Sequence, residues 1–153
     1  MSRSDSKNRK TKQVISRILS IIVFTLIIPY GSAFSQDVDG SIAAFNEAIG
    51  KEYNVNHKGK ILIIEGFREG KQVKVDKVNV FDLDLSTIKF SSQDNSVSLK
   101  CYSDLEGCVE RVLLLNAKKS YKPRVVFGLA DGVSGDEILS KFELVINEMV
   151  KKY

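Results

Sequence analysis

The 153-residue sequence is poor in the residues that build most catalytic and metal centres, because it contains one histidine and two cysteines. The histidine, His57, lies in a polar stretch that predicts a turn, and no G-x-S-x-G motif or equivalent nucleophile accompanies it. Two cysteines without a nearby histidine or second pair make a poor zinc site, and their spacing is not the C-x-x-C of redox proteins. The sequence therefore predicts no catalytic residue, no metal site and no cofactor.

Phosphate-binding and calcium-binding loops are missing as well. Gly128, Gly132 and Gly135 precede a predicted helix, but their spacing matches neither G-x-G-x-x-G nor the P-loop. The acidic residues 130–137, ADGVSGDE, lack the D-x-D-x-D-G spacing of a calcium loop. Basic and aromatic residues do not interleave as they do in proteins that bind single-stranded nucleic acid. No motif identifies a substrate.

One acidic pair keeps an enzymatic alternative open. Asp82 and Asp84, in the sequence FDLDL, lie two residues apart, which places both carboxylates on one face of a predicted strand, where they could share a divalent cation. The competing interpretation is an edge strand with a solvated face, because calcium sites normally recruit further oxygen ligands. The alternative function is thus a metal-dependent or hydrolytic enzyme that uses Asp82, Asp84 and His57.

The first 35 residues have the pattern of a secretory signal peptide. Six basic residues precede residues 18–28, an apolar run too short for the roughly 20 residues of a membrane span. Ala33 and Ser35 then fit a small-x-small cleavage site. We expect cleavage after residues 1–35 and a mature chain that begins at Gln36. The alternative is an uncleaved segment that anchors a structural protein in the cell envelope.

Export changes the charge balance of the chain. Six of the 23 basic residues and one of the 19 acidic residues lie in residues 1–35, which leaves 17 basic and 18 acidic residues in the mature chain. This balance gives no reason to expect a nucleic-acid partner. The remaining basic cluster of Lys118, Lys119, Lys122 and Arg124 is interpreted as a solvated loop. We expect a periplasmic or extracellular protein that binds an unidentified protein or small molecule and meets the membrane only before cleavage.

Helical patterns mark both ends of residues 36–153, which have the length of a single domain. Apolar residues recur at spacings of three and four over residues 41–53, with Asp39 or Ser41 as the cap. An S-x-x-E capping box at Ser134 begins a second, strongly amphipathic helix that must pack on a sheet. Its apolar stripe consists of Ile138, Leu139, Phe142, Val145, Ile146 and Met149.

Between the helices, the sequence predicts five to seven short antiparallel strands. Residues 60–67, KILIIEGF, are apolar on both parities, which is typical of a buried strand, and a turn at Gly70 follows. The valines before and after Asp76 and Lys77 have opposite parities, which a β-bulge at these residues would reconcile. Further strands are expected near residues 88–90, 97–101, 108–114 and 124–129. The predicted fold is α+β, with one curved or partly closed sheet between two helices.

Cys101 and Cys108 are expected to form a disulfide. Cys101 shares a strand face with Leu99, and Cys108 shares one with Val112, so both side chains point the same way across a predicted hairpin. An exported chain allows such a pair to oxidise. The alternative is a pair of free thiols that pack as small apolar residues.

The order of elements from about residue 55 onward, a strand meander followed by one capped amphipathic helix, resembles the pleckstrin-homology-like superfold. The cysteine hairpin between apolar strands is similar to that of small, uncharacterised secreted bacterial proteins. The N-terminal helix departs from the pleckstrin-homology plan. Because superfolds of this kind host binding more often than chemistry, the resemblance implies a small exported, non-catalytic interaction or ligand-binding module of unknown specificity.

Overall fold

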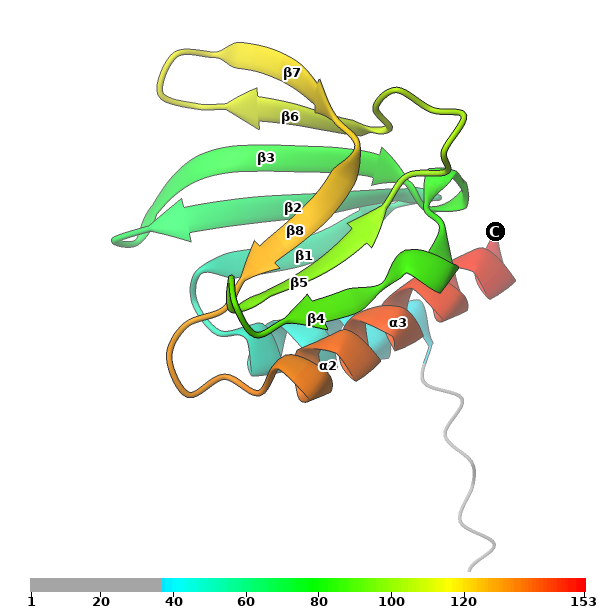
Figure 1. Cartoon of the computed structure of the whole chain (residues 1–153), viewed down its shortest axis with the longest axis horizontal. Helices are drawn as coiled ribbons and strands as arrows, with labels where there is room; N and C mark the ends of the chain where they lie inside the picture. Colours follow the sequence, from blue (N-terminus) through cyan, green and yellow to red (C-terminus); the bar gives the residue numbers. More distant parts are fainter. Residues whose placement is uncertain (1–36) are drawn as a thin grey trace, which may run out of the picture. The chain divides into compact units, whose positions relative to one another are not determined.

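The computed structural model describes residues 37–153, so the predicted signal peptide and its cleavage site at Gln36 lie outside the described residues. In the described part, two helices and eight antiparallel strands form an α+β fold (Figure 1), which confirms the predicted class. The strands belong to two sheets, with the orders β1-β2-β3-β6-β7 and β4-β5-β8, instead of one sheet of five to seven strands. The sequence predicts strands but does not reveal which of them pair.

The chain passes between the two sheets three times. The helices are α2 (Val38–Ile49) and α3 (Gly135–Lys152). The five-stranded sheet contains β1 (Tyr53–Lys58), β2 (Ile61–Arg68), β3 (Lys71–Asn79), β6 (Val109–Leu113) and β7 (Lys118–Lys122). The three-stranded sheet contains β4 (Lys89–Ser91), β5 (Ser96–Lys100) and β8 (Arg124–Gly128). The crossovers therefore follow β3, β5 and β7.

Both helices begin at side-chain caps. Asp37, in place of the expected Asp39 or Ser41, caps α2 by accepting a backbone N–H at 2.8 Å. The predicted cap of α3 is confirmed, since the Ser134 hydroxyl accepts the N–H of Glu137 at 3.3 Å. Each bond satisfies an amide that the first helical turn leaves unpaired.

The helices lie side by side and cover one side of the sheets (Figure 1). Phe45 of α2, Phe127 of β8 and Phe142 of α3 meet at the centre of the core, with ring centroids 4.9 to 5.4 Å apart. The predicted stripe of α3 is buried apart from Leu139, which is half-buried. The same core includes Val55, Leu62 and Ile64 of the five-stranded sheet, so both sheets pack against the helices.

Two edge strands occupy segments that the sequence assigns to loops. β1 carries His57, and β7 contains the lysine-rich residues 118–122. Val55 is the one buried residue of β1, and no residue of β7 is buried. An edge strand with a solvated face needs few apolar residues, which explains why the hydrophobic pattern misses both.

The disulfide between Cys101 and Cys108 is present, with Cα atoms 5.8 Å apart. It does not close a hairpin, because β5 before it and β6 after it belong to different sheets. The bond instead spans the crossover between the sheets. The parity expected for the returning strand is also wrong, since β6 buries Val109 while Val112 is only half-buried.

Candidate functional site

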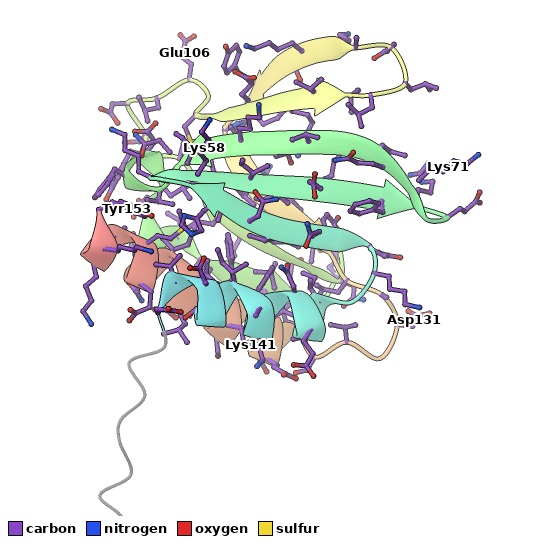
Figure 2. All side chains as sticks on the ribbon, turned by 180° about the vertical axis from the view of Figure 1, so that it is seen from behind. Lys58, Lys71, Glu106, Asp131, Lys141 and Tyr153 are labelled. Atoms are coloured by element: carbon purple, nitrogen blue, oxygen red, sulfur yellow. A yellow bond between two sulfur atoms is a disulfide. The ribbon has the colours of Figure 1, made fainter. Side chains whose placement is uncertain are left out.

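The helix-facing side of the five-stranded sheet is apolar at one end and polar at the other. Leu62 and Ile64 of β2 and Val78 of β3 are buried at one end. Figure 2 shows that end from behind, with Lys58 and Tyr153 close to it and Lys71 at the opposite, projecting end. Toward the Lys71 end, the same face carries four polar side chains. We call this group the polar cluster: Tyr53, Lys74, Asp76 and Arg111.

A buried ion pair forms the centre of the polar cluster. Asp76 is 1% exposed and lies directly opposite Arg111 on the neighbouring strand. Arg111 donates from Nε to Oδ1 and from Nη2 to Oδ2, both at 2.6 Å. This bidentate bond raises the pKa of Arg111 and compensates the buried carboxylate.

Lys74 has no comparable partner. Its side chain is 19% exposed, and its ammonium lies 3.8 Å from Asp76 Oδ2, beyond direct hydrogen-bond distance. The ammonium also lies 5.2 Å from the ring centroid of Tyr53. Lys74 therefore forms a long ion pair with Asp76, whereas Arg111 holds the same carboxylate by two short bonds. Burial lowers the pKa of Lys74, and the attraction of Asp76 offsets only part of that effect.

Gly66 explains how Lys74 can lie in this position. The two residues face each other across β2 and β3, and the lysine stem passes directly over the glycine. A Cβ atom at residue 66 would lie 2.6 Å from Lys74 Cε, closer than carbon atoms pack. The missing side chain therefore leaves the stem its path across the sheet.

Tyr53 connects the polar cluster to the other sheet. Its hydroxyl accepts the N–H of Gly128, in β8, at 3.0 Å. Its ring packs edge-on against Phe127 with centroids 5.2 Å apart. Burial raises the pKa of Tyr53, and the Gly128 bond offsets this in part. The residue thus fixes the distance between β1 and β8.

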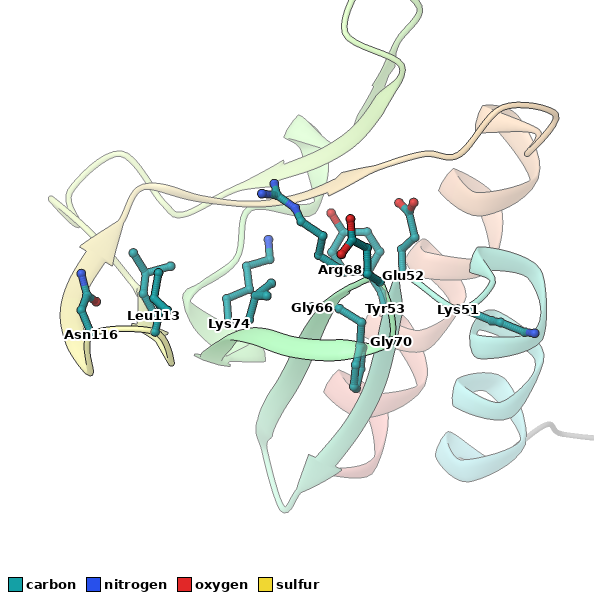
Figure 3. Close-up of a pocket in the computed structure, with 13 residues that line it drawn as sticks. Lys51, Glu52, Tyr53, Gly66, Arg68, Gly70, Lys74, Leu113 and Asn116 are labelled. Atoms are coloured by element: carbon teal, nitrogen blue, oxygen red, sulfur yellow. The ribbon is translucent and has the colours of Figure 1, made fainter.

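A pocket of about 870 Å³ opens beside these side chains (Figure 3). Among its lining residues, Gly66 is buried, Tyr53, Phe67 and Lys74 are half-buried, and the others are exposed. Figure 3 shows Arg68 on one side of Lys74 and Leu113 on the other. The pocket therefore combines a largely desolvated cation with a charged side and an apolar side.

The residues of the enzymatic alternative take part in separate local structures. FDLDL does not form a strand, because two 3-10 turns, Val80–Asp82 and Leu85–Thr87, occupy this segment. The Asp84 carboxylate caps the second turn, accepting the N–H and hydroxyl of Ser86 at 3.1 and 2.7 Å. Among residues 37–153, no three His, Cys, Asp or Glu side chains gather as a metal site.

His57 belongs to β1 and not to a loop. Its Nε2 lies 3.0 Å from Asp39 and its Nδ1 lies 3.2 Å from the carbonyl of Gly59. Tyr153, after α3, lies 3.5 Å from Nδ1, which agrees with its place in Figure 2. These contacts join β1 to the start of α2 and the end of α3, and they include neither Asp82 nor Asp84.

Sequence reasoning misses the polar cluster because it misplaces the bulge. The register shift lies between Gly66 and Phe67, opposite Val73, and not at Asp76 and Lys77. Asp76 therefore continues the inward parity of Val78, and Arg111 shares the inward parity of Val109. A charged residue in phase with buried valines is the signal that marks the site.

Neither helix within residues 37–153 combines the length and apolar character that a membrane-spanning segment requires. No family model, curated protein or solved structure matches this chain. The resemblance to the pleckstrin-homology-like superfold stays a prediction. The pocket and the polar cluster are therefore the features from which we infer a function.

Proposed function

We propose that this protein is a small exported module that binds a small ligand with an anionic group in the pocket beside the polar cluster, and that it does so without catalysis. The observation that carries this proposal is Lys74. Its side chain is 19% exposed, its ammonium forms only a long ion pair of 3.8 Å with Asp76, and it lines a pocket of about 870 Å³. Ligand sites have this size and combine apolar walls with a few polar groups.

The weakly paired ammonium of Lys74 favours an anionic group on the ligand. Desolvating a charge without a hydrogen-bonded partner is costly, and a carboxylate or phosphate in the pocket would offset that cost. Asp76 fills this role only in part, because Arg111 bonds its oxygens at 2.6 Å while the Lys74 ammonium lies 3.8 Å from Oδ2. A ligand oxygen would supply the charge-assisted bond that Lys74 lacks.

The groups at the pocket support the part of the proposal that excludes catalysis. Asp76 is held by Arg111, and the Tyr53 hydroxyl accepts a backbone bond. These contacts fix the polar side chains in place and pair no nucleophile with a general base. They suit a binding site with a fixed geometry.

Fragment screening by NMR tests the proposal. We expect small carboxylates to shift the amide signals of Gly66, Lys74 and Leu113, and we expect Lys74→Met to abolish these shifts. Lys77→Met is the matched control, because Lys77 lies on the same strand but on the opposite, exposed face. Fragments that bind elsewhere, or pocket shifts that survive Lys74→Met, would contradict the proposal.

Export is the second part of the proposal. It is supported by the basic and apolar pattern of residues 1–35 and by the disulfide, which forms in oxidising compartments. N-terminal sequencing and intact mass of the protein recovered from outside the cytoplasm should give a start at or near Gln36. A mass that includes Met1 would rule out cleavage and favour the anchored alternative.

A further inference from the structure

The apolar side of the pocket is made by leucines that the fold leaves in solvent. β6 and the turn after it contain three consecutive leucines, and Leu113 and Leu115 line the pocket. Leu113 is 37% exposed and Leu115 is 97% exposed. Val73, in the bulge of β3, lines the same side and is also exposed. Neighbouring exposed apolar side chains at a pocket are typical of a binding surface.

The cation and this apolar wall are direct neighbours. Lys74 and Leu113 face each other on adjacent strands β3 and β6, and their side chains share the pocket side of the sheet. Leu115 continues the apolar surface away from Lys74 along the chain. A ligand that places its charge at Lys74 therefore has an apolar path beside it.

The other charges of the pocket lie at its rim. Lys51 and Arg68 are basic, Glu52 and Glu69 are acidic, and all four are exposed. Exposed charges of both signs are screened by water and salt and contribute little net attraction. Lys74 is the one charged lining residue that is largely desolvated, so the pocket offers one strong site for a single negative charge.

We infer that the ligand is an amphiphile with one anionic headgroup and a short to medium apolar chain, bound with its headgroup at Lys74 and its chain along Leu113, Leu115 and Val73. This inference rests on the proposed ligand site and specifies its chemistry. It accounts for both unusual features of the pocket, a largely desolvated ammonium whose ion pair is long and leucines that are exposed to solvent.

Titration of the purified protein with a homologous series tests the inference. Acetate, butanoate and octanoate share one headgroup and differ in chain length, whereas octanol and octyltrimethylammonium keep the chain and change the charge. We expect octanoate to bind about tenfold or more tightly than butanoate, since each buried methylene contributes up to about fourfold in affinity. Octanoate should also bind about tenfold more tightly than either uncharged or cationic analogue.

Two pairs of variants separate the headgroup from the chain. Lys74→Met should remove the preference for octanoate over octanol, while Lys77→Met should keep it. Leu115→Ser should weaken octanoate several-fold and leave acetate unchanged. Leu114→Ser is its control, because Leu114 belongs to the same turn and is exposed but does not line the pocket. Leu114 and Leu115 are both exposed, so neither change disturbs the core.

The outcomes distinguish this inference from the proposed function. Equal affinity for octanoate, octanol and octyltrimethylammonium would overturn the anionic headgroup, and equal affinity for acetate and octanoate would overturn the chain. Fragment binding at Gly66 and Lys74 without binding of octanoate would overturn the inference and leave the proposed function standing. Binding to phosphatidylglycerol vesicles that depends equally on Leu114 and Leu115, without binding of octanoate, would identify a membrane contact instead and also overturn it.

Discussion

Within residues 37–153, both sheets bury apolar side chains, but the five-stranded sheet also buries a charged one. On the three-stranded sheet, Val97, Leu99, Val125 and Phe127 are fully buried and apolar. On the five-stranded sheet, the polar cluster places the equally buried Asp76 among apolar side chains. Apolar burial stabilises without fixed geometry, whereas a buried charge needs a partner at each polar atom. The polar cluster is therefore the place where the fold replaces apolar burial with hydrogen-bonded groups of fixed geometry.

The largest expected effect tests the apolar side of this comparison. Phe142→Ala should lower the free energy of unfolding by about 3 to 5 kcal/mol, because it opens a cavity where three phenylalanine rings meet. Denaturant unfolding followed by circular dichroism measures the change. Leu144→Ala, at an exposed position of the same helix, is the control and should have little effect. An unchanged midpoint for Phe142→Ala would mean that α3 is peripheral.

The matching change on the polar side is Asp76→Ala. It should cost about 3 kcal/mol, at the lower end of the range for a broken buried ion pair, because the Arg111 side chain keeps 20% of its surface exposed. The double change Asp76→Leu with Arg111→Met should recover part of this loss, since it removes both charges of the buried pair, although Lys74 still loses its ion pair with Asp76. If the double variant is as unstable as Asp76→Ala, the cluster contributes more than a paired charge to stability.

Loss of the disulfide should have a smaller effect. Cys101→Ala with Cys108→Ala should lower stability by about 2 to 3 kcal/mol, because the bond closes a short loop and restricts the unfolded chain. Since it joins the crossover between the sheets, amide exchange should rise at β5 and β6 more than at α3. Alkylation of the denatured wild-type protein without reductant provides the direct check, and two alkyl groups per chain would show free thiols.

The same comparison explains what the sequence can predict. Strong periodicity identifies α3, most of α2 and the apolar strands β2, β5 and β8. The polar edge strands β1 and β7 give no such signal, and their pairing depends on contacts far apart in sequence. An apolar strand can be predicted from its own sequence, whereas a polar edge strand forms because it pairs with a neighbouring strand.

Prediction of the site fails for a related reason. Alternation along β6 fits Val112 and Leu114 as well as it fits Val109 and Leu113, and only the pairing of Asp76 with Arg111 decides between the two parities. The position of the bulge at Val73 likewise depends on strand pairing, because Gly66 pairs with Lys74 and Phe67 pairs with Gln72. The disulfide is predictable because two cysteines in a chain expected to be exported leave few alternatives.

A small gain in stability should come from the apolar core itself. Ser41 of α2 is buried, and its Oγ has no hydrogen-bond partner among the described residues. Ser41→Ala should raise the free energy of unfolding by about 1 kcal/mol, because it removes a desolvated hydroxyl that gains nothing in return. Ser140→Ala serves as the comparison, since the Ser140 hydroxyl donates to a backbone carbonyl at 2.9 Å and is exposed. A loss of stability for Ser41→Ala would show that the hydroxyl has a partner, such as a bound water.

The smallest effect is the pH dependence that Lys74 gives to stability. Burial lowers the pKa of Lys74 in the folded protein below its ordinary value of 10.5, so the unfolded chain binds more protons between the two pKa values. Stability should therefore rise with pH in that window, as the desolvated ammonium loses its charge. Tyr53 has the opposite influence above pH 10.0, because burial raises its pKa. A comparison of wild type with Lys74→Met removes this influence, since both proteins contain Tyr53. The difference in unfolding free energy, wild type minus variant, should increase from neutral pH toward 10.5. A flat or falling difference would mean that the ammonium is already compensated in the folded protein, and the reason for an anionic ligand at this pocket would disappear.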